Sequence, residues 1–186
     1  MTLWVALLRG VNVGGVTVKN NDLVDVFGAL GFSPVRAILA SGNVVFETMD
    51  ATADRETLAQ KIEGALRARF SYDARVHLRN AHELGEALTS FPFDASDTSR
   101  QPYIVFCLDG STVEELTTSV TPPEDPAESV TAGRNAIYWW PVKGRSTDTP
   151  FAKTLTRAVY KARTTTRNVR TVERILAAMH QSGPTT

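Results

Sequence analysis

The chain has 186 residues, with 20 Lys/Arg and 20 Asp/Glu, and its 42% hydrophobic and 22% charged residues are ordinary for a globular protein. This composition excludes the disordered and fibrous classes, and no apolar run approaches the ~20 residues that cross a bilayer. The single cysteine, Cys107, excludes an internal disulfide framework. The apolar N-terminal segment has no basic leader and stops at Arg9, which predicts a strand and not a signal peptide. We therefore expect a cytoplasmic protein without a membrane partner.

The balanced total charge hides a split along the chain. Residues 134–186 hold ten Lys/Arg and two acids, a net charge of +8, whereas residues 1–133 hold ten and eighteen, a net charge of −8. Such asymmetry indicates either an anionic partner for the C-terminal part or two halves that attract each other.

Residues 1–80 predict the element order β-α-β-β-α-β. Asn20-Asn21-Asp22 offers side chains that cap a helix, Gly31 is typical of the position just after its end, and Ser41-Gly42 suits a hairpin turn. The predicted strands are 3–8, 35–40, 43–47 and 74–78, and the predicted helices are one that carries Leu23 to Leu30 after its capping residues and one over about 53–70.

After a helical and loop linker at 81–101, residues 102–186 begin the same order again. The predicted strands are 103–108, one near 130, and 136–142; the predicted helices are 113–120, opened by Ser111 or Thr112, then 150–162 and 169–179. Residues 164–168 are expected to link the last two helices, so a helix stands where a closing strand would complete the repeat. We predict an α+β fold, a tandem of two ferredoxin-like (split βαβ) α/β sandwich subdomains, the second with an extra C-terminal helix.

Three ordered blocks of sequence resemble the bacterial domain-of-unknown-function family DUF1697. They are Ala6-Leu7-Leu8-Arg9-Gly10-Val11-Asn12-Val13-Gly14-Gly15, Ser41-Gly42-Asn43-Val44-Val45-Phe46 and Thr166-Arg167-Asn168-Val169-Arg170-Thr171-Val172. The third block departs from the family pattern, in which a tryptophan commonly stands where this chain has Val169. The resemblance spans essentially the whole chain and implies a tandem of ferredoxin-like subdomains, but no established activity.

The first block is a candidate ligand site. Gly10 and Gly15 have the spacing of a phosphate-binding loop, but the Lys-Ser/Thr pair that must follow is absent, and the dinucleotide glycine pattern also fails. Successive glycine amides can still form an anion-binding nest, with Arg9 as the charge and Asn12 as a hydrogen-bonding group. The alternative is a strand-to-helix turn in which the glycines are required only for steric reasons and Arg9 forms a structural ion pair.

The basic C-terminal part offers a second candidate. Lys153, Arg157 and Lys161 fall on one face of the predicted helix 150–162. Asn168 or Thr166 is placed to cap the final helix, and arginines beside a helix N-terminus favour an anion or a nucleic-acid backbone. The alternative is a pair of solvated faces that complement the acidic first half.

Other functional patterns are weaker. Tyr138 and Trp140 share a strand face and Trp139 points the other way, so base stacking is an option, although the RNA-recognition motif is missing. Lys143 and Arg145 lie in a turn that suits a phosphate. No His, Cys or acidic spacing resembles a metal site or pairs carboxylates for catalysis, and Cys107 is expected to be a buried structural thiol. Catalytic residues and cofactors stay unknown.

The sequence favours a binding module for a phosphorylated small molecule, nucleotide or nucleic acid at a site between the subdomains. The alternatives are a structural or protein-interaction domain without a ligand and an uncharacterised enzyme. The candidate ligand-binding residues are Arg9, Gly10, Asn12, Gly14, Gly15, Ser41, Asn43, Lys143, Arg145, Arg167 and Asn168.

Overall fold

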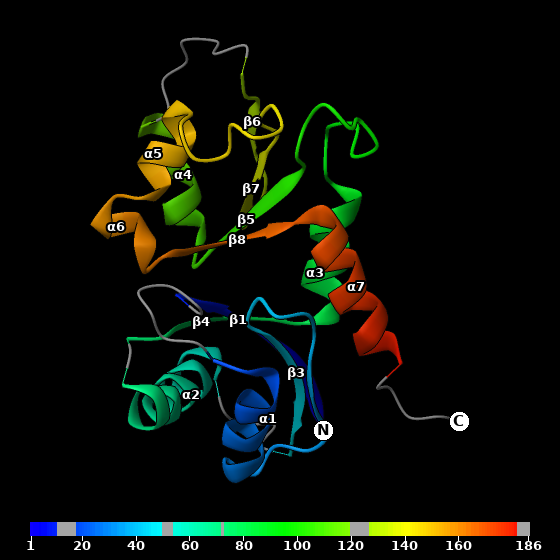
Figure 1. The fold of residues 1–186 in the computed structure, drawn as a ribbon, viewed down its shortest axis with the longest axis vertical. Helices are drawn as coiled ribbons and strands as arrows, with labels where there is room; N and C mark the ends of the chain where they lie inside the picture. Colours follow the sequence, from blue (N-terminus) through cyan, green and yellow to red (C-terminus); the bar gives the residue numbers. More distant parts are fainter. Residues whose placement is uncertain (11–17, 50–53, 72, 120–126, 182–186) are drawn as a thin grey trace. The chain divides into compact units, whose positions relative to one another are not determined.

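The computed structural model describes residues 1–10, 18–49, 54–71, 73–119 and 127–181. Within these residues the fold is mixed α/β, with two four-stranded antiparallel sheets and seven helices (Figure 1). The chain divides into two compact units: residues 1–85 with the stretch that begins at Glu173, and residues 86–172.

The first unit contains one sheet with the spatial order β2-β3-β1-β4. Its central strand β1 pairs with β3 from Thr2↔Thr48 to Leu7↔Asn43, and with β4 from Val5↔Arg79 to Arg9↔Arg75. The elements in chain order are β1 (Thr2–Arg9), α1 (Asn20–Ala29), β2 (Val35–Ala37), β3 (Asn43–Thr48), α2 (Arg55–Phe70), β4 (Arg75–Arg79) and the start of α3 (Ala81–Thr89).

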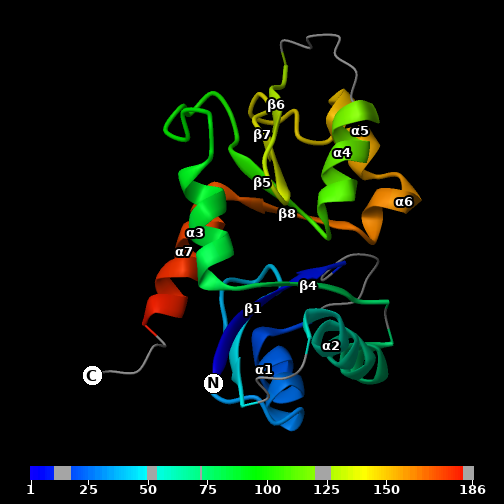
Figure 2. The same ribbon diagram turned by 180° about the vertical axis from the view of Figure 1, so that it is seen from behind.

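Helices α1 and α2 cover one face of this sheet (Figures 1 and 2). Alternate strand residues such as Ala6, Leu8 and Phe46 point to that face, as the two-residue period of a strand requires. The helices contribute buried apolar residues at helical spacing: Leu23, Val26 and Phe27 from α1, and Leu58, Ile62 and Leu66 from α2. Full burial of each such side chain stabilises the fold by about 1.5–3 kcal/mol.

The caps of α1 and α2 are explained by the residues beside them, and one predicted cap is corrected. The N-cap of α1 is Lys19, without a side-chain hydrogen bond, so the predicted capping by Asn20-Asn21-Asp22 is wrong. Gly31 follows the C-cap with φ +84°, a conformation that glycine adopts without strain, as predicted. The carboxylate of Asp54 caps α2 by accepting from Thr57 N at 2.8 Å.

The second unit repeats the same element order completely, with the sheet order β6-β7-β5-β8. Its elements are β5 (Tyr103–Cys107), α4 (Gly110–Ser119), β6 (Val130–Ala132), β7 (Ala136–Trp139), α5 (Pro150–Leu155), α6 (Ala158–Lys161), β8 (Thr164–Asn168) and the start of α7 (Val169–His180). Helices α4, α5 and α6 lie on one side of the sheet (Figures 1 and 2), over a core that includes Val105, Ile137, Trp139 and Phe151. Cys107 lies in this core, fully buried, as expected.

The predicted link at 164–168 is wrong, because this segment is the closing strand β8. It pairs antiparallel with β5 from Tyr103↔Asn168 to Cys107↔Thr164. The segment is polar and lacks apolar alternation, but its threonines are β-branched and fit a pleated sheet. Thr164 and Thr165 are almost fully buried there.

The predicted single helix at 150–162 is also wrong, because α5 and α6 are separate. Arg157 adopts an extended conformation (φ −62°, ψ 140°) as the N-cap of α6. The hydroxyl of Thr156 donates to Lys153 O at 2.7 Å, and that of Thr154 to Pro150 O at 3.1 Å. Threonine side chains that bond back to the helix carbonyls compete with helix propagation. Lys153, Arg157 and Lys161 therefore do not form one stripe on one helix.

Candidate functional site

The face of the first sheet that points away from α1 and α2 carries a row of basic side chains. In the β1–β4 register, Arg9 stands opposite Arg75, Leu7 opposite His77 and Val5 opposite Arg79. Opposed residues of an antiparallel pair share one face of the sheet. We call Arg9, Arg75, His77 and Arg79 the arginine face of the first sheet, although Arg75 stands on the edge strand β4 and its guanidinium reaches Glu63 of α2 at 3.6 Å.

Two members of the arginine face are deeply buried: His77 is 2% exposed and Arg79 3%. The Arg79 guanidinium donates to Leu78 O at 2.7 Å, and its charge acts on Glu83. Burial raises the pKa of Glu83, but hydrogen bonds from Arg55 and the Asn80 backbone, with the charges of both arginines, lower it below its usual range. The buried cation is thus held beside an ionised carboxylate.

Arg9 is the member that the sequence singled out. It ends β1 half-buried, and burial lowers the pKa of its guanidinium because desolvation disfavours the charged form. Gly10 follows with φ +83°, a left-handed conformation that favours glycine. The predicted partners Asn12, Gly14 and Gly15 lie outside the described residues.

Ser41 and Asn43 lie beside the end of β1 in the same unit. Leu8 N donates to Gly42 O at 2.8 Å, which fixes the β2–β3 turn against β1. The Asn43 amide, fully buried, donates to Ser41 Oγ and to Ile38 O, both at 2.9 Å. The structure therefore brings Arg9, Gly10, Ser41 and Asn43 to one end of the first sheet, and Asn43 has a structural role there.

The remaining predicted residues belong to the second unit and lie at two places. Arg167 in β8 is buried and donates to Thr165 Oγ1 at 3.0 Å and Thr166 O at 2.9 Å, and Asn168 caps α7 by accepting from Arg170 N at 3.0 Å, as predicted. In the turn after β7, Arg145 is ion-paired with Asp148 at 2.6 Å. Lys143 in the same turn is exposed.

Tyr138 and Trp140 share a face, as predicted, but other side chains of this unit pack on them. Phe91 packs edge-on against Tyr138 at 5.7 Å, and Phe93 stacks on Trp140 at 5.2 Å with nearly parallel rings. The Arg100 guanidinium lies 4.6 Å from the centre of a Trp140 ring. These contacts explain the aromatic residues structurally and give no support to base stacking.

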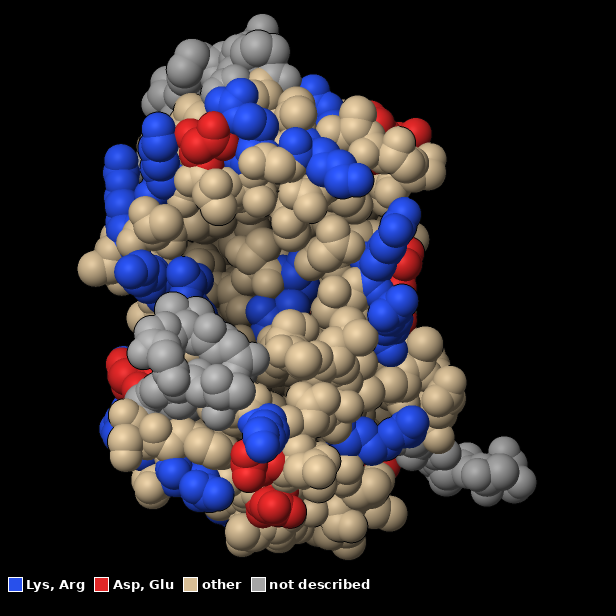
Figure 3. Space-filling model, viewed as in Figure 1, with Lys and Arg blue, Asp and Glu red and all other residues tan. Residues whose placement is uncertain are grey.

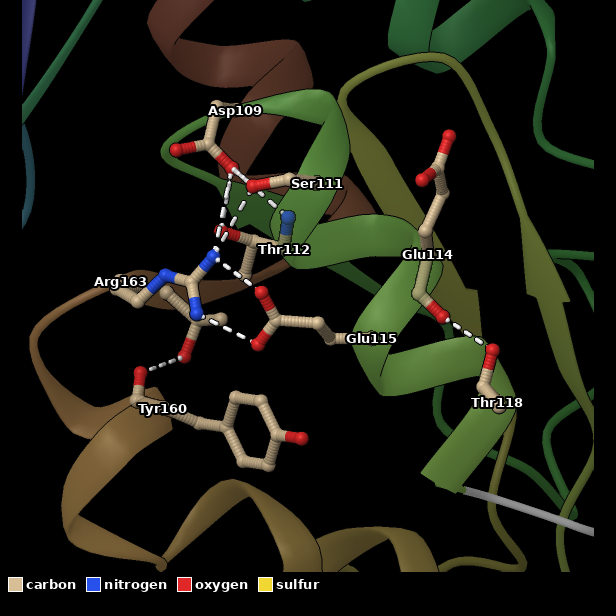
Figure 4. Close-up of polar contacts among 9 residues, drawn as sticks. Asp109, Ser111, Thr112, Glu114, Glu115, Thr118, Tyr160 and Arg163 are labelled. Atoms are coloured by element: carbon tan, nitrogen blue, oxygen red, sulfur yellow. Dashed lines mark hydrogen bonds and ion pairs between the residues drawn. The ribbon is translucent and has the colours of Figure 1, made fainter.

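Sequence reasoning missed a charged cluster at the start of α4 (Figure 4). Arg163 donates to both carboxylate oxygens of Glu115, at 2.7 and 3.0 Å, and lies 3.6 Å from Asp109. Asp109 caps α4 by accepting from the amide and hydroxyl of Thr112, so the expectation that Ser111 or Thr112 opens this helix is wrong. The spacing from Asp109 to Thr112 could have predicted the helix cap. The contact of Arg163 with Glu115 could not be predicted, because the two residues lie far apart in sequence.

The described residues contain no group of three or more His, Cys, Asp or Glu side chains that would hold a metal ion. In the same part of the chain, no helix is long and apolar enough to cross a membrane.

The family model described as "Protein of unknown function (DUF1697)" matches residues 1–138. The chain belongs to the DUF1697 family. The match contains the first two resembling blocks, Ala6–Gly15 and Ser41–Phe46, and therefore the strand ends that gather beside Arg9. The third block lies beyond it.

A solved structure with a similar fold is that of the conserved bacterial protein SP0830 from Streptococcus pneumoniae. It is 24% identical in sequence with a TM-score of 0.77, over 96% of this chain and 98% of that chain. The likeness supports the α+β fold of this DUF1697 protein. No curated protein matches the sequence.

Proposed function

We propose that this DUF1697 protein binds a small phosphorylated anion at the end of the first sheet, with Arg9 as the binding cation. The observation that carries the proposal is the half-burial of Arg9, which lowers the pKa of its guanidinium. An anion in contact would oppose this desolvation, because an opposite charge favours the charged form. Charge-assisted hydrogen bonds from arginine to phosphate are also short and strong.

The neighbours of Arg9 support the same chemistry. Gly10 has a positive φ and no side chain, so a ligand can approach its backbone closely. Arg75 stands opposite Arg9 in the sheet register, so a second arginine belongs to the same end of the β1–β4 pair. Glu63 and Asp73 lie 3.6 and 3.5 Å from Arg75, so a substitution of Arg75 would also break these ion pairs, and Arg9 is the residue chosen for the test.

The test compares the melting temperatures of wild type and Arg9→Gln in inorganic phosphate, pyrophosphate and adenosine monophosphate, against chloride at equal ionic strength. An anion at about ten times its Kd stabilises the folded state by about 1.4 kcal/mol. For a chain of this size we expect a rise in Tm of about 3–5 °C with at least one of the three. Arg9→Gln should lose the rise.

Arg36→Gln is the matched control, because Arg36 is an exposed arginine of β2 in the same sheet. It should keep the full rise in Tm. The proposal is overturned if no anion stabilises the wild type, or if Arg9→Gln responds as strongly as Arg36→Gln.

We extend the proposal to the shared site inferred from sequence, in which Arg167 and Asn168 contact the same anion as Arg9. What supports it is the presence of both arginines in the sequence blocks that resemble the family. Calorimetric titration of Arg167→Gln with the stabilising anion tests this extension. Loss of binding in a folded variant supports the shared site, and wild-type affinity rejects it while leaving the Arg9 site in place.

We also propose that each unit is a ferredoxin-like subdomain, within residues 1–80 and 102–186. The support is the β-α-β-β-α-β order and the matching strand orders of the two sheets. A folded, cooperative fragment of residues 102–186 would support this division.

A structural or interaction role is the second candidate. It is favoured by the buried Asn43 amide, which holds the β2–β3 turn, and by the Arg145–Asp148 ion pair. Under this candidate, none of the anions raises the Tm of the wild type.

A further inference from the structure

Three exposed basic side chains gather on α5 and α6 of the second unit. Lys153, Arg157 and Lys161 are exposed, and Figure 3 shows Lys and Arg side chains along the edge of the unit where these helices lie. Within the described residues, none of the three side chains takes part in an ion pair, a hydrogen bond or a cation–π contact. We call these three residues the α5–α6 basic surface.

The surrounding sequence offers little to neutralise this surface. Residues 149–172 contain six Lys/Arg and no acid. Three carboxylates of this unit are engaged with other arginines, because Glu115 and Asp109 face Arg163 and Asp148 pairs with Arg145. Of the six, Arg163 is compensated by Glu115 and Asp109, whereas Lys153, Arg157 and Lys161, like the exposed Arg170, form no ion pair within the described residues.

The apolar content of the surface narrows the class of partner. Val159, 55% exposed, is the one large hydrophobic side chain that α5 and α6 expose, whereas Phe151, Leu155 and Tyr160 are buried. A helix that lies in a membrane surface presents a broad apolar face, and a protein interface is anchored by aromatic side chains. This surface has neither, so its chemistry is that of a phosphate-backbone contact.

We propose that the α5–α6 basic surface binds the phosphate backbone of a nucleic acid without reading its sequence. Lys153, Arg157 and Lys161 each neutralise one phosphate, and released counterions drive the association. This function is separate from the anion site at Arg9 and does not depend on it.

The test measures binding of a fluorescent mixed-sequence DNA duplex by anisotropy at several salt concentrations. Three phosphate contacts predict a logarithmic salt slope of about −2.7, so affinity should fall about 40-fold between about 50 and 200 mM salt. The triple variant Lys153→Gln/Arg157→Gln/Lys161→Gln should retain the wild-type Tm and lose most of the low-salt binding.

A control variant removes three charges from other exposed positions: Lys19→Gln/Lys61→Gln/Arg174→Gln. It should bind DNA within about twofold of wild type, since it changes net charge equally but leaves the surface intact. Equal loss of binding in both variants shows an effect of net charge alone and overturns the assignment.

Two further probes identify the class of partner. Wild-type protein that binds vesicles rich in phosphatidylserine, or poly-glutamate, more tightly than the duplex overturns the nucleic-acid assignment. Arg9→Gln should bind the duplex as wild type does and still lose its response to small anions, so failure of one proposal is distinguishable from failure of the other.

Discussion

At the scale of single residues, Gly133 has no space beside it for a side chain. A Cβ added there would lie 2.8 Å from Tyr138 Cε2 and 3.1 Å from its hydroxyl oxygen. The Tyr138 ring has little freedom to move, because it is 4% exposed and packs edge-on against Phe91. The β6–β7 turn therefore requires glycine for close approach.

We expect Gly133→Ala to destabilise the protein by about 1–3 kcal/mol, the usual consequence of overpacking. For a chain of this length, the Tm should fall by several degrees, measurable by thermal unfolding. Gly64→Ala is the control: Gly64 lies inside α2 with nothing within 4 Å of an added Cβ, so alanine should stabilise the helix by about 0.5–1 kcal/mol. Equal Tm values for the two variants would contradict the packing argument.

The sequence identified some site residues and not others for a physical reason. Arg9, Gly10 and Ser41 were visible because they occupy a glycine-rich strand end and a turn. Arg75 was not, since it joins Arg9 only through the pairing of β1 with β4, across most of the first unit. The spacing of residues along the sequence does not reveal a contact that forms only when two strands pair.

At the scale of elements, a single carboxylate ties α5 to the second sheet. Glu128 accepts from Trp139 Nε1 at 2.7 Å and from Phe151 N at 2.9 Å, so its two oxygens join β7 to the first turn of α5. Trp139 in turn packs edge-on against Phe151 at 5.6 Å. The position of α5 thus depends on both oxygens.

We expect Glu128→Gln to lower the free energy of unfolding by about 1–3 kcal/mol, because the amide nitrogen would face an N–H donor and leave it unsatisfied. Urea denaturation followed by tryptophan fluorescence gives the change directly. Glu114→Gln on the exposed side of α4 removes the same charge and should have little effect. A similar loss in both variants would show that charge, and not the bridge, matters.

The elements that sequence predicted best were those with a clear apolar pattern: continuous apolar runs in β1 and β5, and Leu58, Ile62 and Leu66 at helical spacing in α2. Strand β8 was missed because its signal is polar: Thr164, Thr165 and Arg167 are buried by pairing with β5, not by their own hydrophobicity. The break between α5 and α6 was missed because it comes from threonine hydroxyls that bond to helix carbonyls. Both outcomes depend on interactions, strand pairing in β8 and side-chain hydrogen bonds at the break between α5 and α6, that the spacing of apolar residues does not reveal.

At the scale of the whole molecule, several carboxylates are stabilised in their charged form. Hydrogen bonds from the Thr112 hydroxyl and amide, and from Ser111, lower the pKa of Asp109 to about 2. The pKa values of other carboxylates are lowered as well: Asp54, Glu83, Asp94, Asp97 and Glu115.

This pattern predicts loss of stability in acid. Because the folded-state pKa values lie below unfolded values of about 4, the stabilisation is fully present above about pH 4 and is lost as the pH falls toward 2. We expect the Tm to be nearly constant from about pH 7 to 5 and to decline below about pH 4. Asp109→Asn should decline less steeply, and an equal slope for both proteins would contradict the role of Asp109.

The division into units places most of α7, from Glu173 onward, with the residues that begin the chain. During synthesis, the whole of the second unit is therefore made before the first unit has its last segment. The second unit is continuous in sequence and is free to fold as it emerges, whereas the first has to wait for the part of α7 that is translated after the whole of the second unit. On the ribosome, the second unit is therefore complete before the first, although translation begins with the first.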